Sequence, residues 1–235
     1  MKALKIEMVH DVVCSWCPIG YANLKQALLK LDIDADIYFF PLELNPDMGP
    51  MGEGIEEHLG RRKQWSQSQL QDYRAHLLAA AEQAGVCIDF SNRTHYYNSN
   101  KAHRLMLWSE AYNRQQTMNE LLIDAYFKRG LDISDNQVLL NLAEQLGLDR
   151  SLAGHALVSN EINQQLLLKK KRVQTFKVSS LPAFIFNECT LVTGSYSVEY
   201  FEHAILGLTK KTAQFDECKL SSPPRVTRRK NDAIH

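Results

Sequence analysis

Two cysteines separated by two residues, Cys14 and Cys17, are the clearest chemically reactive feature of the sequence. They lie in the segment DVVCSWCPIG, directly after an apolar run and directly before a segment with helical periodicity. A C-x-x-C pair at such a junction fits three arrangements, namely half of a zinc site, two buried core cysteines, or a redox-active dithiol. The rest of the sequence bears on the choice among them.

The other cysteines offer little support for a zinc site. A structural zinc site usually takes four ligands, as two closely spaced pairs. The sequence has no second C-x-x-C motif, and Cys87, Cys189 and Cys218 are isolated. Two core cysteines would explain neither the strand-to-helix junction nor Pro18, which follows the pair. These observations favour the redox-active dithiol.

The expected geometry gives the two cysteines different roles. We expect a strand ending near Val13 and a helix starting near Ser15, which places Cys14 at the helix N-terminus. Unpaired N–H groups and the positive end of the helix dipole favour a thiolate there. Cys17 lies one turn inside the helix, where it is more shielded from solvent. The hypothesis is that Cys14 attacks and Cys17 resolves the mixed disulfide, so Cys14 should be alkylated faster.

Composition excludes several broad classes of protein. The chain has 235 residues, 45% of them hydrophobic, and 27 basic residues balance 27 acidic ones. Zero net charge gives no general reason to expect binding to nucleic acid or to a membrane surface. No apolar run reaches the roughly 18–20 residues of a membrane helix. Charged residues such as Lys5 and Glu7 interrupt the N-terminal apolar residues, unlike a secretory signal, so we expect a cytoplasmic protein.

Strand and helix signals surround the cysteine pair. Residues 3–13 alternate between apolar and polar and then become continuously apolar, which predicts an inner strand. Helical spacing follows, and residues 35–45 predict a second strand in which Pro41 indicates an edge or a bulge. Pro and Gly residues predict a loop over 46–54.

Residues 55 to 176 are predicted to be helical throughout. Two helices in this block are expected to begin with capping boxes, one formed by Thr117 and Glu120 and the other by Ser134 and Gln137. The helices differ in length and no fixed-period repeat is present, which indicates a bundle rather than a solenoid.

Strand signals return near the C-terminal end. Residues 181–187 and 189–194 are predicted strands, and the Asn187-Glu188 step between them is consistent with a hairpin. An amphipathic helix follows, with Ser197 as its expected N-cap. The whole pattern predicts an α/β unit interrupted by an all-helical insertion.

Five blocks of sequence carry a more specific resemblance. DVVCSWCPIG, FFPLELNPDM, NKAHRL, LLIDAYFKRGLDISD and SLPAFIF together resemble the DsbA-like thioredoxin superfamily, over about residues 5 to 207. The resemblance is closest to its FrnE-like branch of cytoplasmic thiol-disulfide oxidoreductases. It implies a thioredoxin-like domain formed by residues 1–54 and 177–212 and a helical insertion domain of residues 55–176. Residues 216–235 are expected to form a flexible basic tail.

The resemblance also implies which residues form the site. Cys14 and Cys17 would be the redox pair and Pro182 a cis-proline, which leaves the backbone of Leu181 free to pair with an extended substrate. The NKAHRL helix would lie near the active face, although a polar helix face is the alternative reading of its side chains. The candidate substrate-binding residues are Trp16, Leu181, Pro182, Asn100, His103 and Arg104.

The function implied is disulfide exchange with protein or peptide thiols, with glutathione as a further co-substrate. No cofactor beyond the redox-active disulfide, and no metal, is expected. Two alternatives remain: a glutathione-dependent transferase or isomerase of the kappa-class or 2-hydroxychromene-2-carboxylate isomerase type, and a non-redox, chaperone-like peptide-binding module. Ser15 stands where the family often has Pro, and Ser180-Leu181 where it often has Gly-Val. These departures bear on the redox potential and the substrate.

Overall fold

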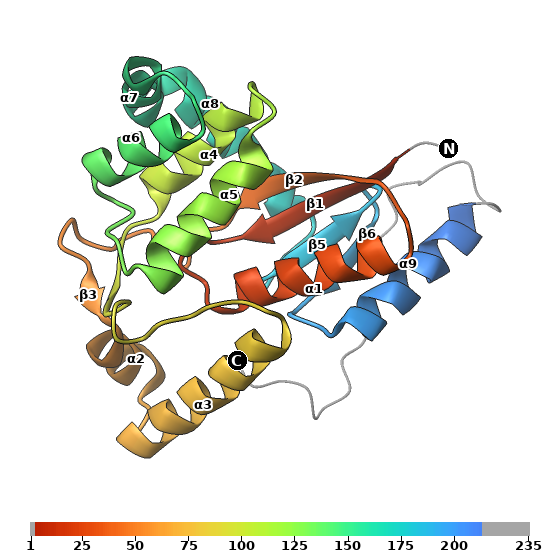
Figure 1. Ribbon diagram of the computed structural model, residues 1–235, viewed down its shortest axis with the longest axis horizontal. Coiled ribbons are helices and arrows are strands. Elements are labelled where there is room, and N and C mark those ends of the chain that lie inside the picture. The colour runs from red at the N-terminus through yellow and green to blue at the C-terminus, as the bar shows by residue number, and fades with distance from the viewer. Residues whose placement is uncertain (1–2, 213–235) are drawn as a thin grey trace.

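A four-stranded sheet lies at the centre of the computed structural model, which describes residues 3–212 (Figure 1). Its strand order is β2-β1-β5-β6. β1 (Leu4–His10) pairs in parallel with β2 (Ala35–Pro41) and antiparallel with β5 (Ala183–Phe186), which pairs antiparallel with β6 (Thr190–Thr193). β1 is central and almost wholly buried because both faces of the sheet are covered.

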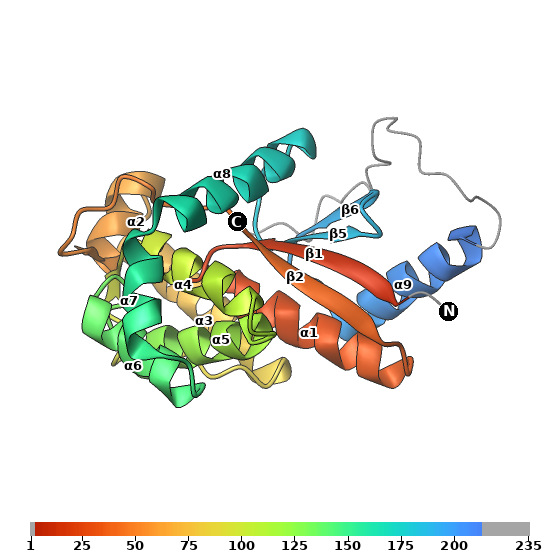
Figure 2. The ribbon, with the colours of Figure 1, turned by 90° about the horizontal axis from the view of Figure 1, so that it is seen from above.

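Helices pack on both faces of this sheet. Figure 2 shows α1 (Trp16–Lys30) and α9 (Val198–Thr212) on one face and α8 (Asn160–Thr175) on the other. On α8, Arg172 Nη2 lies 3.1 Å from the buried Glu7 carboxylate of β1, which fixes this helix to the sheet. The chain therefore has the three layers of a thioredoxin fold.

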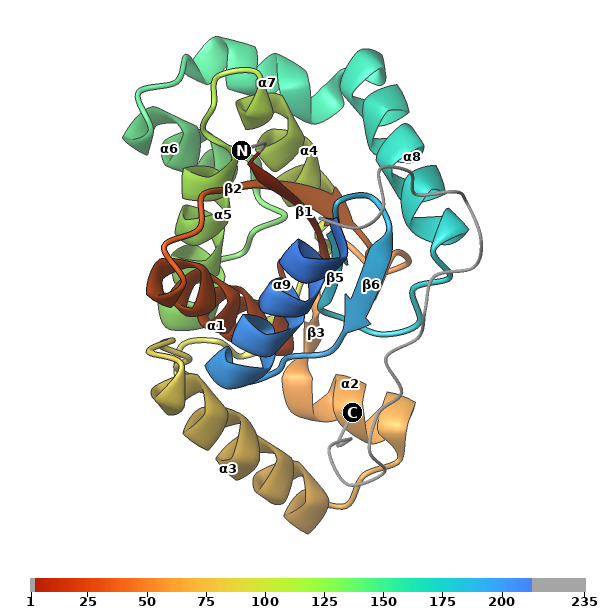
Figure 3. The same ribbon diagram turned by 90° about the vertical axis from the view of Figure 1, so that its right-hand side faces the viewer.

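The segment between β2 and β5 is mainly helical, and in Figure 3 much of it lies outside the outline of the sheet. The predicted α/β thioredoxin fold with a helical insertion is confirmed. Residues 55–176 are not helical throughout, because β4 (His95–Tyr96) lies among them and forms a two-residue ladder with β3 (Glu53–Gly54). The helices before α8 are α2 (Ile55–Lys63), α3 (Gln67–Gln83), α4 (Asn100–Glu110), α5 (Gln115–Ile123), the π-helix η1 (Asp124–Lys128), α6 (Asn136–Gln145) and α7 (Arg150–Val158).

Several predicted local features are confirmed. Pro41 lies in β2, an edge strand of the sheet, where a missing N–H is tolerated. Asn187 and Glu188 both have positive φ angles, 46° and 63°, and connect β5 to β6 as a hairpin. The Ser197 hydroxyl accepts a 3.3 Å hydrogen bond from the N–H of Tyr200, as expected of an N-cap.

Several boundary predictions were wrong, among them that of β2, which ends at Pro41 and not at residue 45. β1 ends at His10 rather than near Val13, because the chain turns at Asp11, whose carbonyl accepts from the N–H of Cys14 at 3.0 Å. α5 starts at Gln115, directly after the preceding turn, so Thr117 lies inside the helix and caps nothing. In α6 the cap is one residue later than expected: the carboxylate of Asp135, rather than the Ser134 hydroxyl, accepts from the first turn.

The predicted domain limits remain predictions, and the proposed tail at 216–235 lies outside the described residues. Across residues 3–212, no helix is long and apolar enough to cross a membrane.

A π-helical turn after α5 gives the insertion an unusual junction. In η1 the consecutive residues Tyr126 and Phe127 are both fully buried. The turn ends at Gly130, whose φ of +65° allows the chain to reverse against the loop that precedes β4. A Cβ atom at Gly130 would lie 2.1 Å from the carbonyl oxygen of Asn92, so only glycine permits this close approach.

Gly147 provides a matched control for this contact, because its φ is +70° and nothing lies within 4 Å of its added Cβ. We expect Gly147→Ala to lower the free energy of unfolding by about 1–2 kcal/mol, the cost of the left-handed conformation alone. Gly130→Ala should lower the free energy of unfolding clearly more, because its Cβ atom also displaces the backbone at Asn92. Urea denaturation of both variants measures the difference, and equal losses would show that the Asn92 contact is unimportant.

Candidate active site

The two cysteines lie where the turn after β1 enters α1. The N–H of Cys17 donates to the carbonyl of Cys14 at 3.1 Å, so Cys14 directly precedes the first helical turn, as predicted. Both are free thiols and both are largely buried, with Cys14 6% and Cys17 2% exposed. A hydrogen bond joins the Cys17 thiol to Cys14. The two sulfur atoms are therefore neighbours within one turn of helix.

The environment of Cys17 favours its protonated form. Burial raises its pKa well above the ordinary value, and the hydrogen bond and charge of Cys14 raise it further. Cys17 is consequently a thiol at neutral pH. This is the state expected of a resolving cysteine that waits for a mixed disulfide to form.

A buried carboxylate, Asp11, holds the turn that carries Cys14. One oxygen accepts from the N–H of Val13 at 3.4 Å and lies 3.3 Å from Nε2 of His103, and the other accepts from the N–H of Leu44 at 2.7 Å. Burial alone would raise the pKa of Asp11, but the hydrogen bond and charge of His103, together with the Leu44 amide, lower it below the ordinary value. Asp11 is therefore an ionised group within the protein interior.

His10 lies beside this carboxylate and behaves differently. Burial, reinforced by the neighbouring charge of His103, lowers the pKa of His10 to about 3, although the charge of Asp11 opposes the shift. Its ring packs edge-on against Phe39 and His103, at centroid distances of 5.0 and 5.4 Å, and its Nε2 has no partner in the structure. His10 is therefore a neutral residue of the core under the site.

The loop before β5 lies against the same helix. The Leu181–Pro182 peptide bond is cis. A Cβ atom at Gly20 of α1 would lie only 2.8 Å from Cγ of Pro182, so glycine allows this loop to approach the helix one turn after Cys17. Among residues 3–212, no hydrogen bond involves the backbone N–H or carbonyl of Leu181.

Helix α3 of the insertion covers the dithiol from the other side. The ring of Trp16 lies 5.5 Å from that of His76, and Tyr73 forms a side-chain hydrogen bond with Ser15. Burial raises the pKa of Tyr73, as does the charge of Cys14, which indicates that the phenol lies close to Cys14. The low exposure of Cys14 follows from this packing.

The three candidates on α4 differ in their surroundings. His103 is buried, and its Nε2 lies 3.3 Å from the Asp11 carboxylate, which accepts from the N–H of Val13 next to Cys14. Arg104 donates to the carbonyls of Leu157 and Ser159, each at 3.2 Å, and thereby fastens α4 to the start of α8. Asn100 accepts from Arg104 at 2.9 Å. Their role in substrate binding stays a prediction.

Sequence reasoning missed three residues near Cys14. Asp11 could have been recognised from the sequence, because it is a carboxylate between an apolar strand and the cysteine pair. Tyr73 and Arg93 could not, because they lie 59 and 79 positions after Cys14 and reach the site only through the fold. Arg93 is 2% exposed, and its Nη2 lies 3.4 Å from the carbonyl oxygen of Val13.

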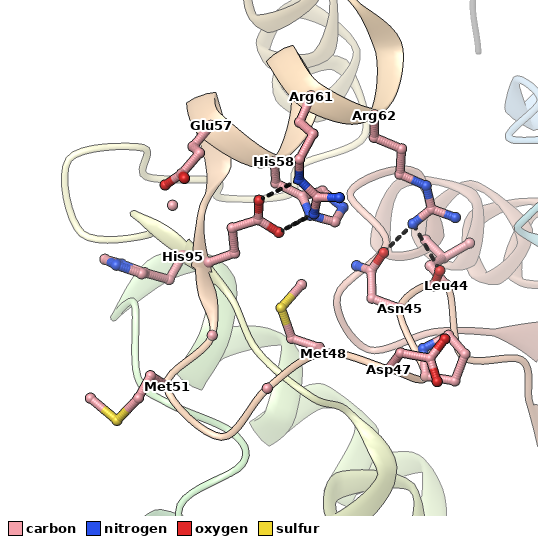
Figure 4. A pocket seen from close by; sticks show the side chains of 15 residues that line it. Leu44, Asn45, Asp47, Met48, Met51, Glu57, His58, Arg61, Arg62 and His95 are labelled. Carbon is pink, nitrogen blue, oxygen red and sulfur yellow. Dashed lines mark hydrogen bonds and ion pairs between the residues drawn. The ribbon is translucent and has the colours of Figure 1, made fainter.

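Two further features of residues 3–212, an exposed cysteine and a polar cavity, are separate from the dithiol. Cys87 is an exposed free thiol, and a secondary redox pair of Cys189 with Cys218, a minor possibility from the sequence, would involve a residue outside the described range. Residues 3–212 contain no cluster of three or more His, Cys, Asp or Glu side chains suited to a metal ion. A polar cavity of about 820 Å³ opens beside α2, where Glu53 binds His58 and Arg61 and Arg62 binds Asn45 (Figure 4).

Comparison with known proteins places this geometry in a family. The family model of the DSBA-like thioredoxin domain matches residues 5–206. The chain is 26% identical over 209 residues to YwbO of Bacillus subtilis (strain 168), an alignment that covers 88% of this chain and 98% of that protein. The chain therefore belongs to the DSBA-like thioredoxin domain family, whose members are oxidoreductases or isomerases.

Two solved structures show the same fold at low identity. The probable DsbA oxidoreductase SCO1869 from Streptomyces coelicolor superimposes with a TM-score of 0.82 and 21% identity, over 93% of this chain and 94% of that one. The cytosolic disulfide reductase DsbM from Pseudomonas aeruginosa with GSH has a TM-score of 0.62 and 16% identity, over 88% and 99%.

The low pKa of His10 predicts a pH dependence of stability. The unfolded chain binds a proton at His10 below its ordinary pKa of 6.5, whereas the folded protein does so only below about 3, so the free energy of unfolding falls as the pH falls through this window. Between pH 7 and pH 5 this loss amounts to about 2 kcal/mol. We expect His10→Leu to remove that part of the pH dependence.

Urea denaturation at the two pH values tests this. His155→Gln is the control, because His155 is exposed on α7 and its removal should leave the dependence intact. If His10→Leu loses as much unfolding free energy between pH 7 and pH 5 as the unchanged protein, His10 is not the source of the pH dependence.

Proposed function

We propose that the protein exchanges disulfides through Cys14 and Cys17, with Cys14 as the attacking thiolate and Cys17 as the resolving thiol. The observation that carries this proposal is the pairing of two free thiols within one turn, one at the start of α1 and the other buried and protonated. The helix N-terminus and its dipole favour the anionic form of Cys14. Two neighbouring cysteines, one favouring the thiolate and the other the protonated thiol, suit a two-step exchange.

The reaction balances without a further cofactor. In the first step the Cys14 thiolate attacks one sulfur of a substrate disulfide, the substrate S–S bond breaks, and one substrate thiolate leaves. In the second step Cys17 loses its proton to that thiolate and attacks the Cys14 sulfur, which releases the second substrate thiolate. The two cysteines are oxidised to a disulfide and the substrate is reduced to two thiols. The reverse sequence oxidises a dithiol substrate.

The surroundings of the thiols support a slender substrate. Cys14 is only 6% exposed, and Trp16 and α3 lie beside it, so an extended peptide or glutathione reaches it more easily than the surface of a folded protein. The unpaired backbone of Leu181, next to Pro182, offers such a segment one donor and one acceptor. Asn100 and Arg104 remain proposed substrate-binding residues, and hydrogen bonds within the protein hold their side chains in place.

In this proposal the two parts of the chain contribute different groups. Residues 1–54 and 177–212 supply the dithiol and Pro182, and residues 55–176 supply the cover over Cys14 and the His103 partner of Asp11. The proposed location is the cytoplasm, in keeping with the structural similarity to DsbM, a cytosolic disulfide reductase whose structure was solved with GSH. Protein thiols and glutathione are the proposed partners.

Trapping of the intermediate tests the order of attack. Cys17→Ser should accumulate a stable mixed disulfide at Cys14 when it is mixed with oxidised glutathione, because the resolving thiol is missing. Cys14→Ser should accumulate none, since Cys17 is buried and protonated. Intact-protein and peptide mass spectrometry locates the adduct. An adduct on Cys17, or equal trapping in both variants, would reverse or remove the assigned roles.

The same variants separate the two alternatives. A glutathione-dependent transferase or isomerase would keep its activity toward a small electrophile in Cys17→Ser, because it needs a single thiol. A chaperone-like module would still suppress aggregation of an unfolded protein in Cys14→Ser. Complete turnover of a disulfide substrate to two thiols should be lost in both variants, which distinguishes the proposed reaction from either alternative.

A further inference from the structure

A fully enclosed arginine lies next to the dithiol. Arg93 belongs to the loop between α3 and β4, is 2% exposed, and ranks among the largest buried side chains. Its guanidinium stays protonated at any physiological pH. The aromatic rings around it, with their distances from the guanidinium carbon, are those of Phe90 (5.6 Å), Tyr96 (5.1 Å), Tyr126 (4.8 Å) and Phe127 (4.9 Å).

The fold holds this arginine in place from several directions. The π-helical turn presents both Tyr126 and Phe127 to the guanidinium, which successive residues of an ordinary helix face would not do. The N–H of Arg93 donates to the carbonyl of Asp89 at 2.8 Å, and Gly130 lets this loop lie directly on η1. The position of the charge is therefore fixed by main-chain contacts and not by a mobile surface loop.

No carboxylate neutralises the charge. None of the ion pairs of residues 3–212 includes Arg93. Nε of Arg93 is buried without a hydrogen-bond partner, and the oxygens of Asp11 are engaged by His103 and the Leu44 amide. Burying an unpaired cation costs several kcal/mol, so a negative partner nearby would be strongly favoured.

The candidate partner is the thiolate of the reduced site. Nη2 of Arg93 lies 3.4 Å from the carbonyl oxygen of Val13, the residue that precedes Cys14. Tyr73 is close enough to both Cys14 and Arg93 for each charge to act on its phenol. The other titratable groups that face this region are Tyr96, Tyr126, Asp11 and Cys17. Burial raises the pKa of Tyr126 and of Cys17, and the Asp11 carboxylate is already paired with His103.

We propose that Arg93 is a positioning residue whose buried charge stabilises the Cys14 thiolate and makes the Cys14–Cys17 couple more oxidising. The inference rests on the proposed function, since it concerns the same dithiol. In the disulfide form the cation has no anionic partner, and in the reduced form it has one, so its charge shifts the equilibrium toward the reduced protein. A purely structural role, filling the aromatic cage, would stabilise the two redox forms equally.

The test compares three proteins: the full chain, Arg93→Met and the control Arg150→Met. Met keeps the apolar stem without the charge, and Arg150 donates to Glu144 and Asn141 of α6 from the start of α7. In glutathione redox buffers, Arg93→Met should shift the thiol–disulfide equilibrium about tenfold toward the disulfide, which corresponds to ~30 mV. The pH profile of Cys14 alkylation should move to higher pH in parallel, whereas Arg150→Met should change neither.

Arg93→Lys and Arg93→Gln keep the inference testable if Arg93→Met fails to fold. Arg93→Lys retains a positive charge, so its thiol–disulfide equilibrium should remain nearer that of the full chain. Arg93→Gln retains only a donor for the Val13 carbonyl, so its equilibrium should shift as in Arg93→Met. An equilibrium within about threefold of the full chain in the uncharged variants, with an unmoved alkylation profile, would overturn the inference. A full chain that forms no internal disulfide would instead defeat the proposed function, and the alkylation profile would still decide the role of Arg93.

Discussion

The buried carboxylate of Asp11 is the interaction on which the site depends. It accepts hydrogen bonds from the turn that carries Cys14, from the chain that leaves β2, and from His103 on α4. An ionised carboxylate within the protein interior is stable only when its lone pairs are satisfied, so these three segments must meet at one point. The carboxylate thereby connects the turn after the central strand, the chain that leaves the edge strand and helix α4, three residues before Cys14.

In the proposed function the helical segment between β2 and β5 is part of the site and more than an addition to the fold. It supplies Tyr73 beside Cys14, His76 beside Trp16, His103 beside Asp11, and Arg93 beside the carbonyl of Val13. The thioredoxin-like part alone would leave Cys14 at an open helix end, with only the dipole to stabilise a thiolate. Changes within the helical block can therefore alter the redox properties of a dithiol that lies more than 50 residues away in the sequence.

The sequence predicted what short-range patterns determine. Apolar periodicity and turn residues predicted the order of strands and helices, the Asn187-Glu188 hairpin and the Ser197 cap. Predictions that depended on competition between neighbours were wrong. Asp135 is a better N-cap than Ser134 at that chain position, and α5 begins before Thr117 because the preceding turn leads directly into it.

The long-range contacts of the site were beyond the reach of the sequence patterns. A buried arginine in an aromatic cage has the local sequence of a polar loop, and its burial depends on a π-helical turn about 30 residues later. His103 illustrates the same limit, since its helix spacing gave no indication that its partner would be Asp11 of the first strand's turn. Such pairs are created by the tertiary fold, which brings charges together that no local pattern associates.

The reversible formation of a disulfide between Cys14 and Cys17 tests the central claim most directly. The full chain is equilibrated in a series of glutathione redox buffers, quenched with acid, and its thiols are counted and located by mass spectrometry. The account predicts that an internal disulfide joining these two residues forms as the buffer becomes oxidising and disappears as it becomes reducing. Cysteines that remain thiols throughout, or a Cys14 that carries only glutathione while Cys17 stays free, would contradict it.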